Sequence, residues 1–326
     1  MVRNTRIVRY AAACASALML CAGLAPAAFA DGGPAGPNPV AAGLDAYWTP
    51  ARMAAALPGD TAKGAGAGPA ASAAPPAVDG PRPGEYIPPS RSFTGIPQAG
   101  TFFWTDAGGT GRTCSGSVVR SPGRSLVLSA GHCLKGYAGT SPKRHLAFVP
   151  QYHDGLKPFG VFPVRVGGVY VPQQYYDLGS RAGAEYDVAL AVTEPDQDGT
   201  PLQDAVGGIR LLTGTGYVHA PVRMIGYPAG AAEPLECWSW TTPWASDDPA
   251  EPGTFPRIAC DAFVGGTSGG PMLVPWFGGW AVVGVIGGYH TGGNTSQVSY
   301  SAYFGTAVSA LYRAAVTGAP PAGPAS

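Results

Sequence analysis

Charged residues are scarce in this chain of 326 residues: Asp, Glu, Lys and Arg make up 12%, and the formal net charge is zero. No basic patch or block of like charges occurs, which argues against nucleic acid as a partner. Cysteine is also sparse, with six residues, and none stands in the CxxC spacing of structural zinc sites. The composition therefore gives no support to a nucleic-acid-binding or zinc-stabilised protein.

An export signal is predicted at the N-terminus. Three arginines, Arg3, Arg6 and Arg9, precede an apolar stretch from 10 to about 24. The small residues of Ala28-Phe29-Ala30 predict cleavage before Asp31. The stretch is short for a bilayer span, so a signal peptide at 1–30 is favoured over an uncleaved membrane anchor. We expect a secreted, extracellular protein without stable membrane association.

Four cysteines remain after removal of the signal peptide: Cys114, Cys133, Cys237 and Cys260. An even number in an oxidising compartment predicts two disulfides. Four cysteines allow three pairings, and their spacing alone does not choose among them.

Composition divides the mature chain into segments. Residues 31–91 are rich in Ala, Gly and Pro and have few large apolar side chains, which predicts a mostly disordered pro-segment or flexible tether. Within it, residues 44–57 could form a docking helix, and Arg82 and Arg91 are candidate cleavage points. The folded domain is expected at 92–317, followed by a disordered tail at 318–326.

Short β-type runs dominate from residue 93 onwards. They are rich in β-branched and aromatic residues and are separated by Gly, Pro, Asp and Asn, without long helices between them. This texture predicts an all-β sandwich or barrels. One helical pattern, at 306–316, predicts a C-terminal helix packed on the β-body. The predicted strands are 101–104, 114–120, 126–129, 145–150, 161–171, 187–192, 222–227, 257–263, 270–274 and 280–286.

A glycine cluster surrounds one serine at 265–271, Gly-Gly-Thr-Ser-Gly-Gly-Pro. Glycines let the backbone turn tightly and leave Ser268 little steric cover. In such a turn the amides of Gly266 and Ser268 could point at one spot beside the hydroxyl, as in a nucleophile with an oxyanion hole. The alternative is a Gly-rich turn with an incidental serine.

A base and an orienting acid are suggested by two strand ends. His132 follows the apolar run 126–130 and precedes Cys133, which could hold the strand exit through a disulfide. A histidine placed in this way suits acid–base work. Asp187 opens the apolar run 188–192, where a partly desolvated carboxylate needs a donor such as an imidazole N–H. The other histidines, Asp154 and Asp177 have weaker contexts.

Three sequence blocks carry a family resemblance. Ser-Ala-Gly-His-Cys at 129–133, Tyr-Asp-Val-Ala-Leu at 186–190 and the glycine cluster at 265–271 resemble the signature blocks of chymotrypsin/trypsin-like serine peptidases. Their order, His then Asp then Ser, matches that family. The resemblance covers roughly 93–316 and is closest to secreted bacterial members, including the glutamyl-endopeptidase-like branch.

The resemblance implies a fold and an active site. The fold is two six-stranded antiparallel β-barrels with the active site in the cleft between them. His132 and Asp187 would come from the first barrel and Ser268 from the second, and these three would be catalytic. The amides of Gly266 and Ser268 would form the oxyanion hole.

The resemblance also implies the disulfides Cys114–Cys133 and Cys237–Cys260. Each would close a loop of about 20 residues, which the chain-entropy model values at roughly 3 kcal/mol.

Three positions depart from the family pattern. Many trypsin-like enzymes carry Asp just before the nucleophile, where it pairs with a newly freed N-terminus, but Thr267 stands here. Ala262 offers no carboxylate for a cationic substrate side chain, and Ile286 stands where glutamyl endopeptidases typically place a histidine. Side-chain preference is therefore left open. The expected substrate pocket consists of Ala262, Ile286, Gly287, Gly288, Tyr289 and His290.

The implied function is a secreted serine endopeptidase that hydrolyses polypeptides through an acyl-enzyme, as a monomer, without metal or cofactor. One alternative is a binding module of the same fold whose triad is not assembled, and another is a secreted esterase. The acidic residues Asp247, Asp248 and Glu251 could bind calcium, but a solvated loop is the favoured interpretation.

Overall fold

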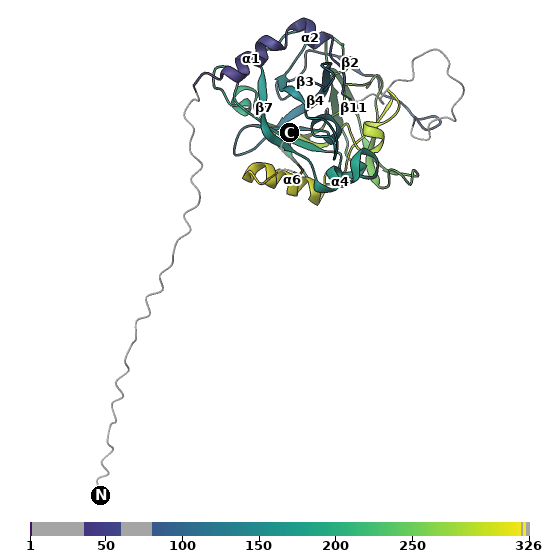
Figure 1. The fold of residues 1–326 in the computed structure, drawn as a ribbon. Coiled ribbons are helices and arrows are strands. Elements are labelled where there is room, and N and C mark those ends of the chain that lie inside the picture. Colours follow the sequence, from purple (N-terminus) through teal and green to yellow (C-terminus); the bar gives the residue numbers. More distant parts are fainter. Residues whose placement is uncertain (2–35, 60–79, 321, 324–326) are drawn as a thin grey trace. The chain divides into compact units, whose positions relative to one another are not determined.

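The computed structural model describes residue 1 and residues 36–59, 80–320 and 322–323 (Figure 1). All described helices and strands belong to one compact unit, Pro34–Ser326. The predicted signal peptide, apart from Met1, lies outside the described residues. Within these residues, no helix is both long enough and apolar enough to span a membrane.

Six strands in the first half of this unit form a closed antiparallel barrel. Their hydrogen-bonded order is β4-β3-β6-β7-β8-β5, and β5 pairs again with β4, which closes the ring and removes the open edges. A short parallel strand, β1 (Leu57–Pro58), adds to the outer side of β4. The barrel strands are β3 (Ala99–Thr105), β4 (Gly111–Val119), β5 (Leu126–Ser129), β6 (Arg144–Pro150), β7 (Phe162–Tyr170) and β8 (Ala189–Thr193).

The apolar runs of β5 and β8 are continuous because both of their faces are buried. In β5, Leu126 and Leu128 join one hydrophobic cluster, whereas Val127 joins another that contains Phe102 and Phe148. Successive side chains of a strand point to opposite faces, so neighbouring residues of β5 enter different hydrophobic clusters. This is the pattern of a strand that is buried on both faces. The predicted strands of this half are confirmed.

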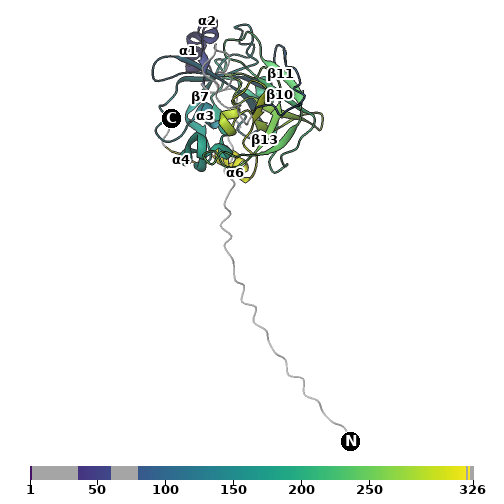
Figure 2. The same cartoon turned by 90° about the vertical axis from the view of Figure 1, so that its right-hand side faces the viewer.

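The second half contains two sheets instead of the predicted second barrel. One is an open six-stranded sheet of order β2-β11-β10-β14-β15-β9, and the other is the three-stranded β12-β13-β16. Figure 2 shows this half, with β10, β11 and β13, beside the half that carries β7 and α3. The strands are β2 (Arg91–Ser92), β9 (Arg210–Leu211), β10 (Val222–Gly226), β11 (Leu235–Ser239), β12 (Thr241–Ala245), β13 (Thr254–Ala259), β14 (Pro271–Trp276), β15 (Gly279–Val285) and β16 (Val298–Tyr300).

The prediction of two six-stranded barrels is therefore right for the first half and wrong for the second. Among the described strands, no pairing joins the six-stranded sheet to the three-stranded one, so the second ring stays open, although β12 and β13 pair without a break across Pro243 and Pro256. Between β15 and β16, the Val285 amide donates to the side-chain oxygen of Ser301 at 3.0 Å rather than to a strand carbonyl.

Two main helices flank the β-structure. The predicted C-terminal helix at 306–316 is confirmed as α6 (Thr306–Thr317), which buries Val308, Leu311 and Ala315 and contacts β7 and β8. The helix α4 (Gln173–Ala182) was not predicted, because its sequence is polar and Gly179 interrupts it with a non-helical backbone. Shorter helical turns are α3 (Gly131–Leu134), α5 (Leu202–Val206), η1 (Ala184–Tyr186) and η2 (Tyr289–Gly292).

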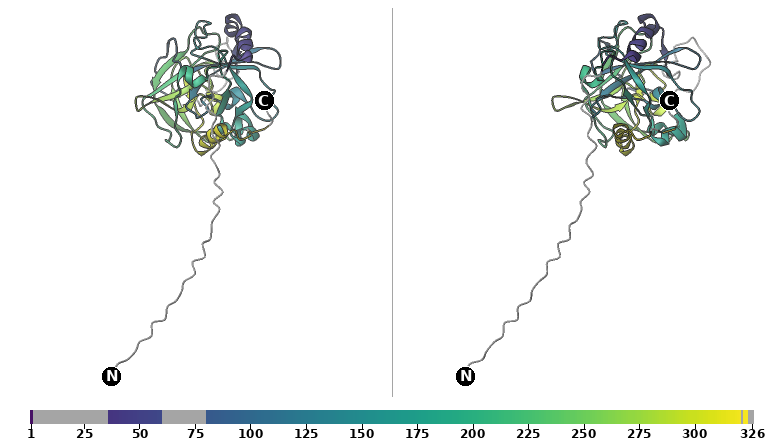
Figure 3. Two further views of the ribbon diagram at one scale, coloured as in Figure 1. Left: turned by 90° about the vertical axis from the view of Figure 1, so that its left-hand side faces the viewer. Right: turned by 60° about the vertical axis from the view of Figure 1, so that its left-hand side comes forward.

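Residues 36–59 are folded against the first barrel, although we expected a mostly disordered segment with a possible helix at 44–57. They form α1 (Pro39–Tyr47), α2 (Pro50–Ala54) and β1, on the side of this unit opposite α6 (Figures 1 and 3). Trp48 and Met53 are buried in the core, and the Trp48 indole donates to the His145 carbonyl at 2.9 Å. The role of this segment in maturation stays a prediction, and residues 60–79 lie outside the described part.

Residues 80–92 lie across the second half. The buried guanidinium of Arg257 donates to both carboxylate oxygens of Glu85 at 2.6 Å, and β2 pairs with β11. Nearby, the buried carboxylate of Glu236 pairs with Arg91 and Arg223. Cleavage at Arg91 with loss of the segment before it would leave Arg257 as an unpaired buried charge, which is costly.

The Glu85–Arg257 pair makes the first testable prediction. Glu85→Gln should lower the free energy of unfolding by about 2 kcal/mol, because it leaves the Arg257 charge uncompensated. The hydrogen bond from Arg257 holds the pKa of Glu85 below its ordinary value. The ion pair therefore contributes its full stabilisation of the folded protein above the pKa that Glu85 has in the unfolded chain. This stabilisation is lost as the pH falls through the lowered pKa of Glu85 in the folded protein.

Urea unfolding at a series of pH values checks this. The gap between wild type and Glu85→Gln should be widest near neutral pH and should close below about pH 4. Glu233→Gln, at a partly exposed glutamate without an ion pair among the described residues, is the matched control and should have little effect. A gap that is constant over the whole pH range would contradict the assignment.

Candidate active site

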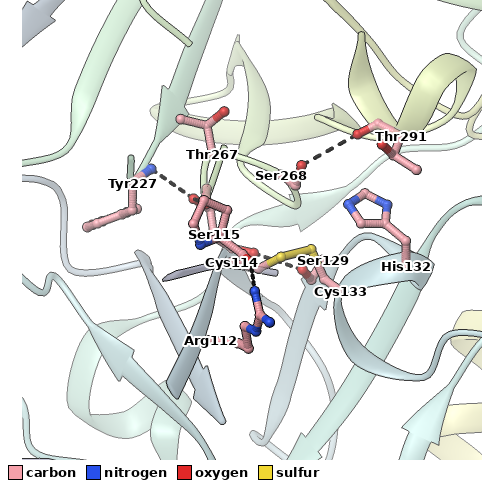
Figure 4. The surroundings of a disulfide bond; sticks show 12 residues. Arg112, Cys114, Ser115, Ser129, His132, Cys133, Tyr227, Thr267, Ser268 and Thr291 are labelled. Atoms are coloured by element: carbon pink, nitrogen blue, oxygen red, sulfur yellow. Dashed lines mark hydrogen bonds between the residues drawn. A yellow bond between two sulfur atoms is a disulfide. The ribbon is translucent and has the colours of Figure 1, made fainter. Parts of the chain in front are cut away.

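His132 is held at the exit of a buried strand. β5 ends at Ser129, and α3 begins at Gly131, so His132 lies in the first turn that leaves the barrel. The next residue, Cys133, forms a disulfide with Cys114 on β4, and Figure 4 shows the imidazole beside this disulfide. The His132 side chain is only 8% exposed. Its position is therefore set by strand, helix and disulfide together.

Asp187 contacts His132 at two places. Its Oδ2 lies 2.7 Å from the imidazole Nδ1, and its Oδ1 accepts the backbone N–H of His132 at 2.9 Å. The Gly288 amide, from the second half, donates to Oδ2 at 2.8 Å. The residues predicted as base and orienting acid, 55 positions apart in the sequence, are thus brought together.

The Asp187 carboxylate is charged despite its burial. Burial pushes the pKa of this carboxyl upwards, but the interactions with His132 and the Gly288 amide outweigh it, so the pKa lies below its ordinary value. An ionised carboxylate can only accept hydrogen bonds, so Nδ1 of His132 must carry the proton in this contact. In the neutral ring Nε2 then has the lone pair, which is the atom a general base needs.

The loop around Ser268 is tied to the first barrel through Ser115. The Ser115 amide donates to the Ser268 carbonyl at 2.7 Å, and its hydroxyl donates to the Gly266 carbonyl at 3.0 Å. The same hydroxyl accepts the Tyr227 amide at 2.8 Å, and the Ser129 hydroxyl donates to the Ser115 carbonyl at 2.8 Å (Figure 4). Three of these hydrogen bonds connect the first barrel to the second half, and the bond from Ser129 fixes Ser115 within the barrel.

Two glycines permit this loop conformation. Gly266 has φ 93° and Gly269 has φ 80°, values that side chains rarely adopt. A Cβ on Gly266 would lie 2.5 Å from the Ala229 nitrogen, and a Cβ on Gly269 would collide with Ser129. The predicted need for glycine on both sides of the serine therefore has a steric cause.

The backbone around Ser268 orients two amides. The Gly265 carbonyl accepts from the Ala229 amide at 3.0 Å, and the Thr267 carbonyl accepts from the Gly270 amide at 2.9 Å. In a trans peptide the N–H points opposite to the C=O of the same unit. The amides of Gly266 and Ser268 therefore point away from these contacts, as the oxyanion-hole prediction requires.

Thr267 is satisfied locally. Its hydroxyl and its amide both contact the Val264 carbonyl, at 2.7 and 3.2 Å, and the residue is fully buried. A neutral side chain bonded in this way needs no ion pair with a freed N-terminus. The loop is thus assembled without the charge pair that Asp would form at this position.

The expected pocket residues contribute in different ways. The Ile286 carbonyl accepts the Gly269 amide at 2.7 Å, so Ile286 borders the serine loop, whereas Gly288 bonds Asp187. Gly287 also lies against Asp187. Tyr289 is buried in an aromatic cluster, and His290 contacts Glu251. Ala262 adopts a left-handed φ of 68° in a turn. Their role as a specificity pocket stays a prediction.

Several residues at the site had no signal in the sequence. Ser115 follows Cys114 in the predicted strand 114–120, and no local sequence pattern indicated that it forms four hydrogen bonds. Glu251 was expected in a solvated loop, but that interpretation is wrong, because Glu251 is only 4% exposed. Its carboxylate accepts hydrogen bonds from His290 and Arg181. Among the described residues, one group of possible metal ligands occurs, namely Cys114, His132 and Cys133. Its two sulfur atoms are joined in the disulfide and cannot act as thiolate ligands.

The second disulfide, Cys237–Cys260, links the middle of β11 to the residue after β13. It joins the two sheets of the second half, and both pairings are those that the resemblance implies.

Comparison with known proteins gives matches among solved structures only. No protein-family model matches the chain, and no curated protein does either. The protease Anisep from Arthrobacter nicotinovorans is 28% identical, with a TM-score of 0.58, and the match covers 70% of this chain and 99% of that one. A thermostable serine protease, AL20, from an extremophilic microorganism is 27% identical over 68% of this chain and 97% of its own, with a TM-score of 0.56.

A more distant match shows the fold alone. The structure of a Glu endopeptidase in complex with MPD is 18% identical, with a TM-score of 0.51, over 72% of this chain and 98% of that one. The chain therefore has the chymotrypsin fold and matches bacterial serine proteases of that fold, as its sequence blocks indicated.

The Ser115 contacts lead to a prediction about stability. Ser115→Ala should cost about 2 kcal/mol of unfolding free energy, because the Gly266 carbonyl and the Tyr227 amide both lose a buried partner. Ser117→Ala is the matched control: Ser117 is on the same strand and fully buried, but its hydroxyl has no partner among the described residues. Its removal should be neutral or stabilising, as measured by urea unfolding. Equal losses in the two variants would contradict the proposed importance of the Ser115 hydrogen bonds.

Proposed function

We propose that this protein is a secreted serine endopeptidase that hydrolyses polypeptides with Ser268, His132 and Asp187. The observation that carries the proposal is the buried, ionised Asp187, which bonds the imidazole Nδ1 at 2.7 Å and leaves Nε2 as the base. The similarity to two bacterial serine proteases at 27–28% identity supports the reaction class. The two disulfides fit the oxidising compartment that export would reach.

The chemistry follows from these roles. His132 Nε2 takes the proton of Ser268 as Oγ forms a bond to the substrate carbonyl carbon. The resulting oxyanion is stabilised by the amides of Gly266 and Ser268. The C–N bond then breaks as His132 gives its proton to the leaving amine, and a water molecule hydrolyses the acyl-enzyme by the same steps. No metal or cofactor is required.

Asp187 has two roles in this mechanism. It selects the tautomer of His132 and stabilises the imidazolium that forms during proton transfer. Because it bonds both the ring and the backbone of His132, it also restricts rotation of the ring. Its bond from Gly288 places the charge at the junction of the two halves.

One observation favours the alternative of a silent binding module: Ser268 is fully buried in this structure. A module of that kind would never react with an electrophile at Ser268, whereas an endopeptidase whose site opens would. An esterase would react in the same way as an endopeptidase, but it would turn over esters and leave peptides intact.

Covalent labelling separates these functions. A fluorophosphonate should label the secreted wild-type protein and leave Ser268→Ala unlabelled, because Ser268 is the activated nucleophile.

Asp187→Asn should keep the fold and lower kcat by about 10⁴, since the wrong histidine tautomer is favoured. A peptide library, analysed by mass spectrometry, would show peptide cleavage and its side-chain preference. Absence of labelling in the wild type would overturn the proposal.

A further inference from the structure

Access to Ser268 is closed by the chain itself. Ser268 is fully buried, and its hydroxyl donates to the Thr291 carbonyl at 3.5 Å (Figure 4). Nucleophilic attack requires a substrate carbonyl carbon at about 3 Å from Oγ. A substrate can therefore reach the serine only if Thr291 and its neighbours move.

The segment that covers Ser268 is a strained turn. It comprises η2 (Tyr289–Gly292), in which His290 and Thr291 have φ values of 48° and 53°. Residues other than glycine rarely adopt this left-handed region, and such strain persists only where surrounding contacts hold it. Gly293, which follows the turn, is also at positive φ and provides a pivot for its movement.

One carboxylate supplies contacts that hold the turn. Glu251 Oε2 accepts the backbone N–H of His290 at 2.7 Å, and its Oε1 lies 3.3 Å from His290 Nδ1. Arg181, on α4, donates to the same Oε1 at 3.3 Å. The side chain of Glu251 is 5% exposed, so its bonds to His290 face little competition from water, whereas the Arg181 side chain is 63% exposed.

The start of the turn is anchored separately. The Tyr289 ring lies 5.1 Å from Tyr300 and 5.6 Å from Phe255, between ring centroids, and it is buried. Tyr289 thus stays with the β-structure, while the movable part is residues 290–292. Glu251 contacts this movable part at its first residue.

We infer that Glu251 is a positioning residue: it holds residues 290–292 over Ser268 and thereby sets the fraction of molecules with an open active site. The inference rests on the proposed function, because it concerns access of polypeptide to the same serine. A substrate binds only the open form, so its apparent affinity is reduced by the fraction that is open. Once the substrate is bound, the turn is displaced in every molecule.

Weakening the bonds from Glu251 should therefore change substrate binding more than chemistry. In Glu251→Ala, the second-order rate of fluorophosphonate labelling should rise about tenfold, and KM for a peptide should fall by a similar factor. The value of kcat should change less than about twofold, because the bound state is the same in both proteins. A residue with a merely structural role would lower activity or leave it unchanged.

Two further variants keep the test decisive. Glu251→Gln has the same size, keeps an oxygen for the His290 amide and loses the charge, so it should fold and show a smaller acceleration. Asp248→Asn is the matched control: Asp248 pairs with the same Arg181 at 3.0 Å but makes neither bond to His290. It should label at the wild-type rate.

The outcomes distinguish this inference from the proposed function. Equal labelling rates and KM values in folded wild type, Glu251→Gln and Glu251→Ala would overturn the inference and leave the function in place. Slower labelling of the folded Glu251 variants would also overturn it. Complete absence of labelling in all of these proteins would overturn the function, and the inference with it.

Discussion

The buried carboxylate of Asp187 is the constraint on which the site depends. A charge in this position is tolerated only because three N–H groups satisfy it. Two belong to His132, in the first half, and the third belongs to Gly288, in the second. The same bonds that stabilise the charge therefore orient the imidazole and join the two halves. Ser115 adds a second connection, from the barrel to the backbone on both sides of Thr267.

Much of the first barrel and the proximity of His132 and Asp187 could be predicted from the sequence. Apolar runs such as 126–129 are long enough to indicate strands, and glycines around Ser268 indicate a tight turn. Whether the strands of the second half close into a barrel could not be predicted in the same way, because closure depends on which strands pair with each other. The Val285 amide bonds the Ser301 hydroxyl, 16 positions further along the chain, and no local pattern contains this contact.

Burial was the other feature that local patterns did not contain. The Ala, Gly and Pro content of 31–91 predicted disorder. Trp48 and Met53 are nevertheless buried against the barrel, and their burial offsets the entropy cost of ordering the segment. Glu251 was expected in solvent for a similar reason: its acidic neighbours suggested a loop, and its partners Arg181 and His290 are 70 and 39 positions away.

The central claim, that ionised Asp187 holds His132 with its proton on Nδ1, is open to direct measurement. Nitrogen-15 NMR of the imidazole in the folded protein, assigned by comparison with a His132 variant, reports which ring nitrogen carries the proton. We predict the Nδ1–H form for the neutral ring, replaced by another state in Asp187→Asn. A neutral wild-type ring protonated on Nε2 would contradict the claim, since Nε2 would then have no lone pair to accept the serine proton.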